Sequence, residues 1–232
     1  MQSKKIICSI ALIIFAGVSC LWAGDVATFV DLGFSPDGRT FMFGQYGVQS
    51  GTLRPWAELF VVDVPNNNFV SGGRLSYTGQ RPVVSGNDGQ GALHRLIAQN
   101  AALAERHRID YTLQGQPLFI TLDNSNHPST IEFRNFETGD FFRATLFPTF
   151  YGSGADLRSS FYITLERTER NGSRRVYTVG TPQVRRPLIS SYRIRTVMIA
   201  PHDGSMIMVI EMRRQHPNGT FDIRYMVEAL RL

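Results

Sequence analysis

The residues best suited to chemistry in this sequence are arginines near its C-terminal end. Six of them follow one another closely: Arg185, Arg186, Arg193, Arg195, Arg213 and Arg214. Side chains alternate between the two faces of a strand, so Arg193 and Arg195 share a face, with Tyr192 beside them as a stacking group. A guanidinium group binds carboxylates and phosphates through paired hydrogen bonds. We therefore interpret the six arginines as a candidate anion-binding surface.

The charge of the chain is divided unevenly between its two halves. Residues 24–140 contain 8 Arg and 12 acidic residues, whereas residues 141–232 contain 14 Arg and 7 acidic residues. The second half is strongly basic and suits an acidic partner. The alternative is that the two halves face each other, so that the arginines pair with carboxylates of the same chain.

Lysine and cysteine are confined to the first 20 residues of the chain. Lys4 and Lys5 are the only lysines, and Cys8 and Cys20 are the only cysteines. Without this segment the chain has no Schiff-base lysine, phosphate-loop lysine, cysteine nucleophile or zinc–thiolate site. It also has no disulfide, so the hydrophobic core alone must hold an exported fold together. We expect no cofactor and no metal.

The first 23 residues have the organisation of a secretory signal peptide. Lys4 and Lys5 form a positive start, residues 6–15 are apolar, and small residues lead to Ala23. We expect cleavage after Ala23, which leaves one mainly-β secreted or periplasmic domain over residues 24–232.

Two alternatives stay open for this leader. Residues 6–23 approach the length of a membrane span, so the leader could remain as an uncleaved anchor. Residues 17–20 (Gly-Val-Ser-Cys) also loosely resemble a lipidation motif that would modify Cys20 and give a lipoprotein. We expect membrane contact only in that lipidated form.

The sequence contains no strong catalytic or metal-binding signature. The histidines are scattered, and no pair has the i, i+4 spacing of a helical zinc site: His94, His107, His127, His202 and His216. The nearest match to a serine nucleophile elbow, at residues 151–154, lies between two expected strands rather than between a strand and a helix. Residues 123–126 alternate oxygen ligands as a calcium loop does, but they lack its glycine and terminal glutamate. We assign no catalytic residue and no metal ligand.

Short apolar runs separated by turn residues predict about a dozen strands. These runs cover residues 26–34, 39–46, 57–64, 69–77, 118–122, 130–136, 141–147, 161–167, 175–179, 192–199, 205–212 and 220–229. Residues 206–210 are apolar at every position, which predicts a strand covered on both faces. A helical period appears once, near residues 92–108. The fold class is therefore mainly β, with antiparallel hairpins and meanders, sandwich-like or partial propeller-like packing, and one amphipathic helix.

Two turns frame this architecture and carry a local resemblance. Residues 34–39, Phe-Ser-Pro-Asp-Gly-Arg, resemble the phrase that precedes a strand in each blade of TolB-like and WD40-like β-propellers. Residues 199–204 repeat the turn with His202 inserted between the proline and the aspartate. A closed propeller needs four or more blades, so two copies predict hairpins rather than a complete ring.

The mature chain as a whole resembles a family of bacterial predicted secreted proteins of unknown function. The resemblance rests on residues 34–46, 57–64, 91–104 and 115–118. It implies export and a single domain, and it supplies no activity and no site residues.

These observations lead to a binding function rather than an enzymatic one. We expect an exported envelope module that recognises an anionic envelope component or a protein partner through its arginine-rich half. Export argues against a nucleic-acid partner. The alternatives are a periplasmic hydrolase whose site is assembled from scattered loop residues, and a structural envelope protein.

Overall fold

The computed structural model describes residues 24–121 and 128–232. The expected signal peptide, with its lysines and cysteines, lies outside the described residues. So do residues 123–126, which alternate oxygen ligands, and His127.

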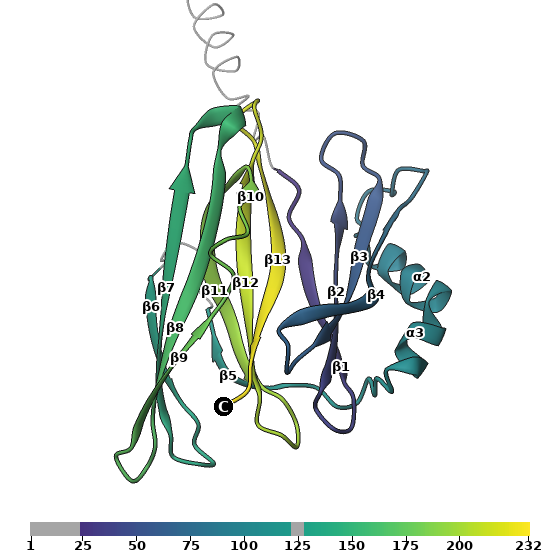
Figure 1. The fold of residues 1–232 in the computed structure, drawn as a ribbon. Coiled ribbons are helices and arrows are strands. Elements are labelled where there is room, and N and C mark those ends of the chain that lie inside the picture. The colour runs from purple at the N-terminus through teal and green to yellow at the C-terminus, as the bar shows by residue number, and fades with distance from the viewer. Residues whose placement is uncertain (1–23, 122–127) are drawn as a thin grey trace, which may run out of the picture.

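The described chain forms three antiparallel sheets and a pair of helices (Figure 1). The first sheet is a meander of β1 (Thr28–Phe34), β2 (Thr40–Val48), β3 (Pro55–Asp63) and β4 (Asn68–Thr78). The central sheet has the order β13 (Phe221–Leu230), β12 (Met206–Gln215), β11 (Ile189–Ile199), β5 (Gln116–Ile120). The outer sheet contains β6 (Thr130–Arg134), β7 (Phe141–Tyr151), β8 (Arg158–Thr168), β9 (Arg174–Val179) and the short β10 (Arg186–Pro187). A single 3-10 turn (Gly154–Asp156) follows β7.

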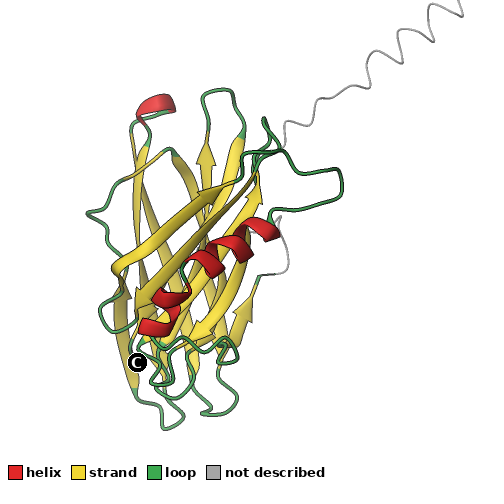
Figure 2. Ribbon diagram, turned by 90° about the vertical axis from the view of Figure 1, so that its right-hand side faces the viewer, coloured by secondary structure: helices red, strands yellow, loops and turns green. Residues whose placement is uncertain are grey.

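The elements are stacked in four layers. The outer sheet packs on one face of the central sheet, the first sheet packs on the other face, and α2 (Gln90–Gln99) and α3 (Ala101–Arg106) cover the far side of the first sheet. Figure 2 shows the two helices lying across this outer face. The predicted fold class is confirmed, and the packing of successive sheets corresponds to the sandwich-like alternative.

The central strand β12 shows why the sheets stack in this order. All five residues of its stretch 206–210 are buried, as their continuous apolar character predicts. Met206, Met208 and Ile210 face the outer sheet, whereas Ile207 and Val209 face the first sheet. A strand that is apolar on both faces needs a layer on each side, which places this sheet in the middle.

The helical region differs in one respect from its prediction. Two short helices replace the single helix expected near residues 92–108, because the chain breaks at Asn100, whose side-chain amide donates to the Leu96 carbonyl at 2.8 Å. Leu93 packs against Gly44 of β2 so closely that a Cβ at position 44 would lie 2.6 Å from it. Glycine at this position therefore lets α2 approach the sheet.

The two similar turns lie next to each other at one end of the stack. A Cβ added to Gly38 would lie 2.9 Å from the Asp203 carboxyl group. In the first turn the Ser35 hydroxyl donates to Asp37 at 2.6 Å, and in the second the Ser205 hydroxyl donates to Asp203 at 2.7 Å. Both aspartates also accept backbone N–H groups two residues onward, so their role is to shape the turns. The two segments that resemble the propeller-blade phrase are thus hairpin turns in the structure.

Candidate functional site

The structure separates the six candidate arginines into two groups. Arg193 and Arg195 of β11 and Arg213 of β12 line one cavity, which we call the basic pocket. Arg214 follows Arg213 on the strand and therefore points to the opposite face of the sheet. Arg185 stacks on Tyr151 and Arg186 on Phe161, with ring distances of 4.1 and 4.9 Å, away from this cavity.

The basic pocket lies on the face of the central sheet that is turned toward the first sheet. It has a volume of about 580 Å³. Its lining comes from the start of β11, the end of β12 and the start of β13: Val26, Ser191, Tyr192, Arg193, Arg195, Glu211, Arg213, Phe221, Ile223 and Tyr225. Three guanidinium groups and one carboxylate give this lining a net formal charge of +2.

The buried Arg193 and the partly buried Glu211 form the floor of this pocket. One terminal nitrogen of Arg193 donates to both oxygens of the Glu211 carboxylate, at 2.6 and 2.7 Å. The Tyr225 hydroxyl donates to the same carboxylate at 3.4 Å. Burial, assisted by the negative charge of Glu211, raises the pKa of Tyr225 to about 12. The phenol therefore stays neutral, and the carboxylate at the floor is already neutralised by Arg193.

Arg195 and Arg213 supply the other two guanidinium groups of the lining. Arg195 is half-buried at an irregularity of β11, where the pairing with β12 shifts register between Ile194 and Thr196. Arg213 is exposed, and its guanidinium lies 3.7 Å from the centre of the Phe221 ring. Within the described chain, no carboxylate lies within ion-pair distance of Arg213. Its charge is thus available at the mouth of the pocket, held in place by the aromatic ring.

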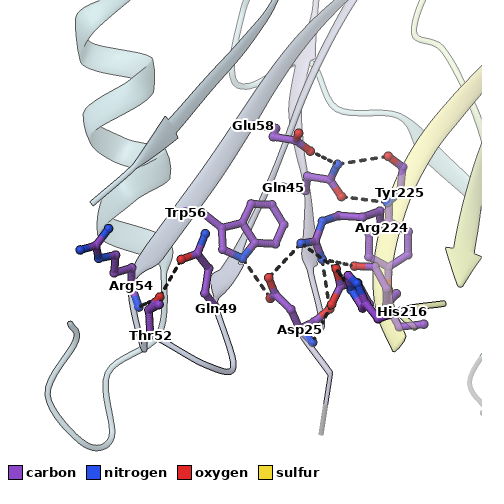
Figure 3. A network of polar contacts seen from close by, with 12 residues as sticks. Asp25, Gln45, Gln49, Thr52, Arg54, Trp56, Glu58, His216, Arg224 and Tyr225 are labelled. Atoms are coloured by element: carbon purple, nitrogen blue, oxygen red, sulfur yellow. Dashed lines mark hydrogen bonds and ion pairs between the residues drawn. The ribbon is translucent and has the colours of Figure 1, made fainter. Parts of the chain in front are cut away.

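A polar network beside the pocket fixes the beginning of the described chain (Figure 3). The buried Asp25 carboxylate accepts hydrogen bonds from the Trp56 indole at 2.9 Å and from Arg224 at 2.8 Å. Arg224 also lies flat over the Trp56 ring, 3.9 Å from its centre. The backbone of residues 25–27 runs beside Ile223 of β13, and Val26 completes the wall of the pocket.

The alternative interpretation was that the two halves of the chain pair with each other, and the structure shows such pairing for only some of the arginines. In the described ranges three ion pairs join an arginine of the basic half to an acid of the other half: Arg143–Glu132, Arg167–Asp140 and Arg224–Asp25. None of the six candidate arginines belongs to these pairs. Within the described chain, pairing between the halves therefore does not engage the charge of Arg213 in the basic pocket.

A second cavity, of about 530 Å³, brings a histidine and three acidic residues together, as a hydrolase site would. It contains His202, Asp203, Asp140 and Glu137 near the C-terminal end of the chain. Its acids are already engaged: Asp140 pairs with Arg167 at 2.7 Å, and Asp203 holds the turn at Ser205. No His–carboxylate pair within hydrogen-bond distance forms there among the described residues. The arrangement offers no general base oriented by a partner.

Sequence reasoning did not identify four residues that shape the basic pocket. Glu211, Phe221, Tyr225 and Val26 line it, yet none of them was singled out. The pairing of Arg193 with Glu211 across a hairpin was in principle readable, because opposite charges often stand opposite each other on neighbouring strands. Val26 could not be found in this way, since it reaches the pocket only through the tertiary fold.

Comparisons with known proteins place the chain in a family without assigning it an activity. In the described ranges no helix is long and apolar enough to cross a bilayer. Searches of curated proteins and of solved structures gave no match. A family model described as "Predicted secreted protein (DUF2259)" matches residues 42–231, which include both helices and strands of all three sheets. The chain therefore belongs to this family of predicted secreted proteins of unknown function.

Proposed function

We propose that this protein binds an anionic component of the cell envelope in the basic pocket. The observation that carries the proposal is the surplus of positive charge at a preformed cavity. Arg193 neutralises the one carboxylate among the lining residues, and the charge of Arg213, which lies in no ion pair within the described chain, can attract an anion. Guanidinium groups at a cavity are suited to a carboxylate, sulfate or phosphate group.

The shape and lining of the pocket favour an anionic sugar over a flat membrane surface. The cavity of about 580 Å³ lies within the range of small-molecule sites. Phe221 and Tyr225 add aromatic surface next to the arginines, and Val26 and Ile223 add aliphatic surface. A sugar ring has an apolar face and polar edges, so it can stack on such a wall while its charged group meets a guanidinium.

Heparin, a sulfated glycan, is a practical probe of this function. Arg213→Gln removes a charge at the mouth of the pocket and leaves the buried pair of Arg193 and Glu211 intact. Arg214→Gln is the matched control, because it removes the same charge from the next position on the strand, outside the pocket. We expect Arg213→Gln to elute from a heparin column at lower salt than the wild type, and Arg214→Gln to elute near the wild type.

Two results would contradict the proposal. One is equal retention of wild type and Arg213→Gln, which would place heparin binding elsewhere. The other is co-sedimentation with anionic liposomes in the absence of any heparin retention, which would identify a lipid surface rather than a glycan as the partner. A change at Arg193 is less informative here, because it exposes a buried carboxylate and risks unfolding.

A further inference from the structure

Along the outer edge of β13, other parts of the protein supply hydrogen-bond partners to the backbone at nearly every outward-facing position. β13 is the last strand of the central sheet, so alternate residues direct their backbone N–H and C=O groups away from β12. Ile223 pairs with the backbone of residues 25–27, at 2.9 and 3.1 Å. Tyr225 receives a side-chain amide, since its N–H donates to the Gln45 oxygen at 2.8 Å and its carbonyl accepts from the Gln45 nitrogen at 3.3 Å.

Further along the same edge, the N–H of Ala229 donates to the Asn67 side-chain oxygen at 2.7 Å. Between these closures lies Val227. Its alternation with Tyr225 and Ala229 directs its N–H and C=O outward, and neither group has a hydrogen-bond partner in the described part of the chain. Val227 is only 7% exposed. Buried backbone groups are nearly always paired, so the two open groups of Val227 stand out.

A cavity of about 250 Å³ opens at this position, and we call it the edge pocket. It is lined by the β3–β4 hairpin, the end of β13 and the segment before β10: Val62, Asn67, Asn68, Phe69, Arg74, Thr181, Val184, Arg186, Met226, Val227 and Glu228. The side chain of Val227 packs in the core between the first and central sheets. The part of Val227 that meets the cavity is therefore its backbone.

The edge pocket also contains a buried carboxylate without an ion pair. Glu228 is 2% exposed, and it accepts one hydrogen bond, from the Asn67 amide at 2.6 Å. Arg74 and Arg186 line the same cavity, but neither lies within ion-pair distance of Glu228 in the described structure. Burial raises the pKa of this carboxyl group. A buried charge normally has a partner of opposite sign, and a ligand with a positive group could supply one.

We propose that the edge pocket binds the free amino end of a short peptide. The second residue of the ligand pairs with Val227 as a strand added to the sheet edge does: its amide N–H donates to the Val227 carbonyl, and its carboxylate accepts from the Val227 N–H. The terminal ammonium of the ligand pairs with Glu228, and its carboxylate faces Arg186. The volume of about 250 Å³ limits the ligand to one or two residues, with small side chains against Val184 and Met226.

Alanyl-alanine, titrated into the full secreted chain by calorimetry, tests this proposal. We expect measurable binding that weakens about tenfold or more when the amino group is acetylated, because acetylation removes the positive charge that pairs with Glu228. The ester analogue alanyl-lactate lacks the amide N–H that would donate to the Val227 carbonyl, so we expect it to bind about fivefold more weakly. These comparisons use the wild-type protein alone.

Variants separate the edge pocket from the basic pocket. Arg186→Gln should weaken binding of alanyl-alanine, whereas Arg185→Gln, which removes the neighbouring charge outside the cavity, and Arg213→Gln should leave it unchanged. Glu228→Gln should weaken it as well. Absence of binding, equal binding of the acetylated dipeptide, or equal losses in Arg185→Gln and Arg186→Gln would each overturn the proposal. None of these results depends on whether the basic pocket binds an anion.

Discussion

Two glutamates of the central sheet, the partly buried Glu211 and the buried Glu228, have opposite surroundings. Glu211 is held by Arg193 at 2.6 Å and by the Tyr225 hydroxyl, so the basic pocket has no unbalanced negative charge. Within the described residues, Glu228 accepts a hydrogen bond only from the neutral amide of Asn67. The acid of one cavity is neutralised within the chain and the acid of the other is not, and this difference underlies the different ligands that we propose for the two cavities.

The largest expected effect comes from breaking the pair that neutralises Glu211. Arg193→Met leaves a carboxylate buried without its cation, which we expect to lower the free energy of unfolding by about 3–5 kcal/mol. Urea denaturation measures this change. The double variant Arg193→Met with Glu211→Leu should regain most of the loss, because an apolar pair fills the space without a buried charge. A single variant as stable as the wild type would show that the pair is not essential to the fold.

A smaller loss of stability is expected when the hydrogen bonds between Gln45 and the β13 edge are removed. Gln45 is 1% exposed, and Gln45→Leu leaves the buried N–H and C=O of Tyr225 without partners. We expect a cost of about 3 kcal/mol, since each unsatisfied group costs roughly 1–3 kcal/mol. Thermal and urea denaturation can be compared with Gln215→Leu, an exposed position on the adjacent strand. Equal stability of the two variants would mean that the edge does not need this amide, and the argument about Val227 would lose its basis.

The smallest expected effect concerns the pH dependence of stability at Glu228. Burial raises the pKa of this group in the folded protein, although the Asn67 hydrogen bond and the charge of Arg186 oppose the shift. The folded state therefore keeps a proton that the unfolded chain has lost, and stability falls as pH rises from about 4.3, the ordinary pKa of glutamate, through the folded pKa. Glu228→Gln removes this dependence, so its stability relative to the wild type should rise as the pH increases from about 4.3 through the folded pKa.

Urea denaturation at several pH values checks this prediction. Glu105→Gln, at an exposed position of α3, is the control and should follow the wild type throughout. If the difference between Glu228→Gln and the wild type stays constant with pH, or shrinks as pH rises, the carboxylate of Glu228 does not carry an unbalanced charge in the folded protein.

The sequence predicted local structure well because the signals were local. Turn residues and alternating apolar runs located the strands, and the continuous apolar run of 206–210 identified the buried middle strand. The break at Asn100 was not predicted, since it depends on a side-chain amide turning back to the carbonyl of Leu96. The assignment of β5 to the central sheet was not predicted either, because strand pairing across about 75 residues leaves no local pattern.

The candidate site was predicted by residue type and only partly by position. Alternation correctly placed Arg193 and Arg195 together, and it also separates Arg213 from Arg214, although all six arginines were grouped as one surface. Val227 could not be recognised at all from the sequence. Its significance comes from backbone groups that are left open while its neighbours at the edge are closed by Gln45 and Asn67.

The most direct test of the account is a crossed calorimetric titration on one set of proteins. A sulfated heparin disaccharide and alanyl-alanine are each titrated into the wild type, Arg213→Gln and Glu228→Gln. We predict that Arg213→Gln weakens only the disaccharide, about tenfold, and that Glu228→Gln weakens only the dipeptide by a similar factor, about 1.4 kcal/mol in each case. Loss of both ligands in the same variant, or of neither in both, would contradict the assignment of two separate pockets with opposite charge preference.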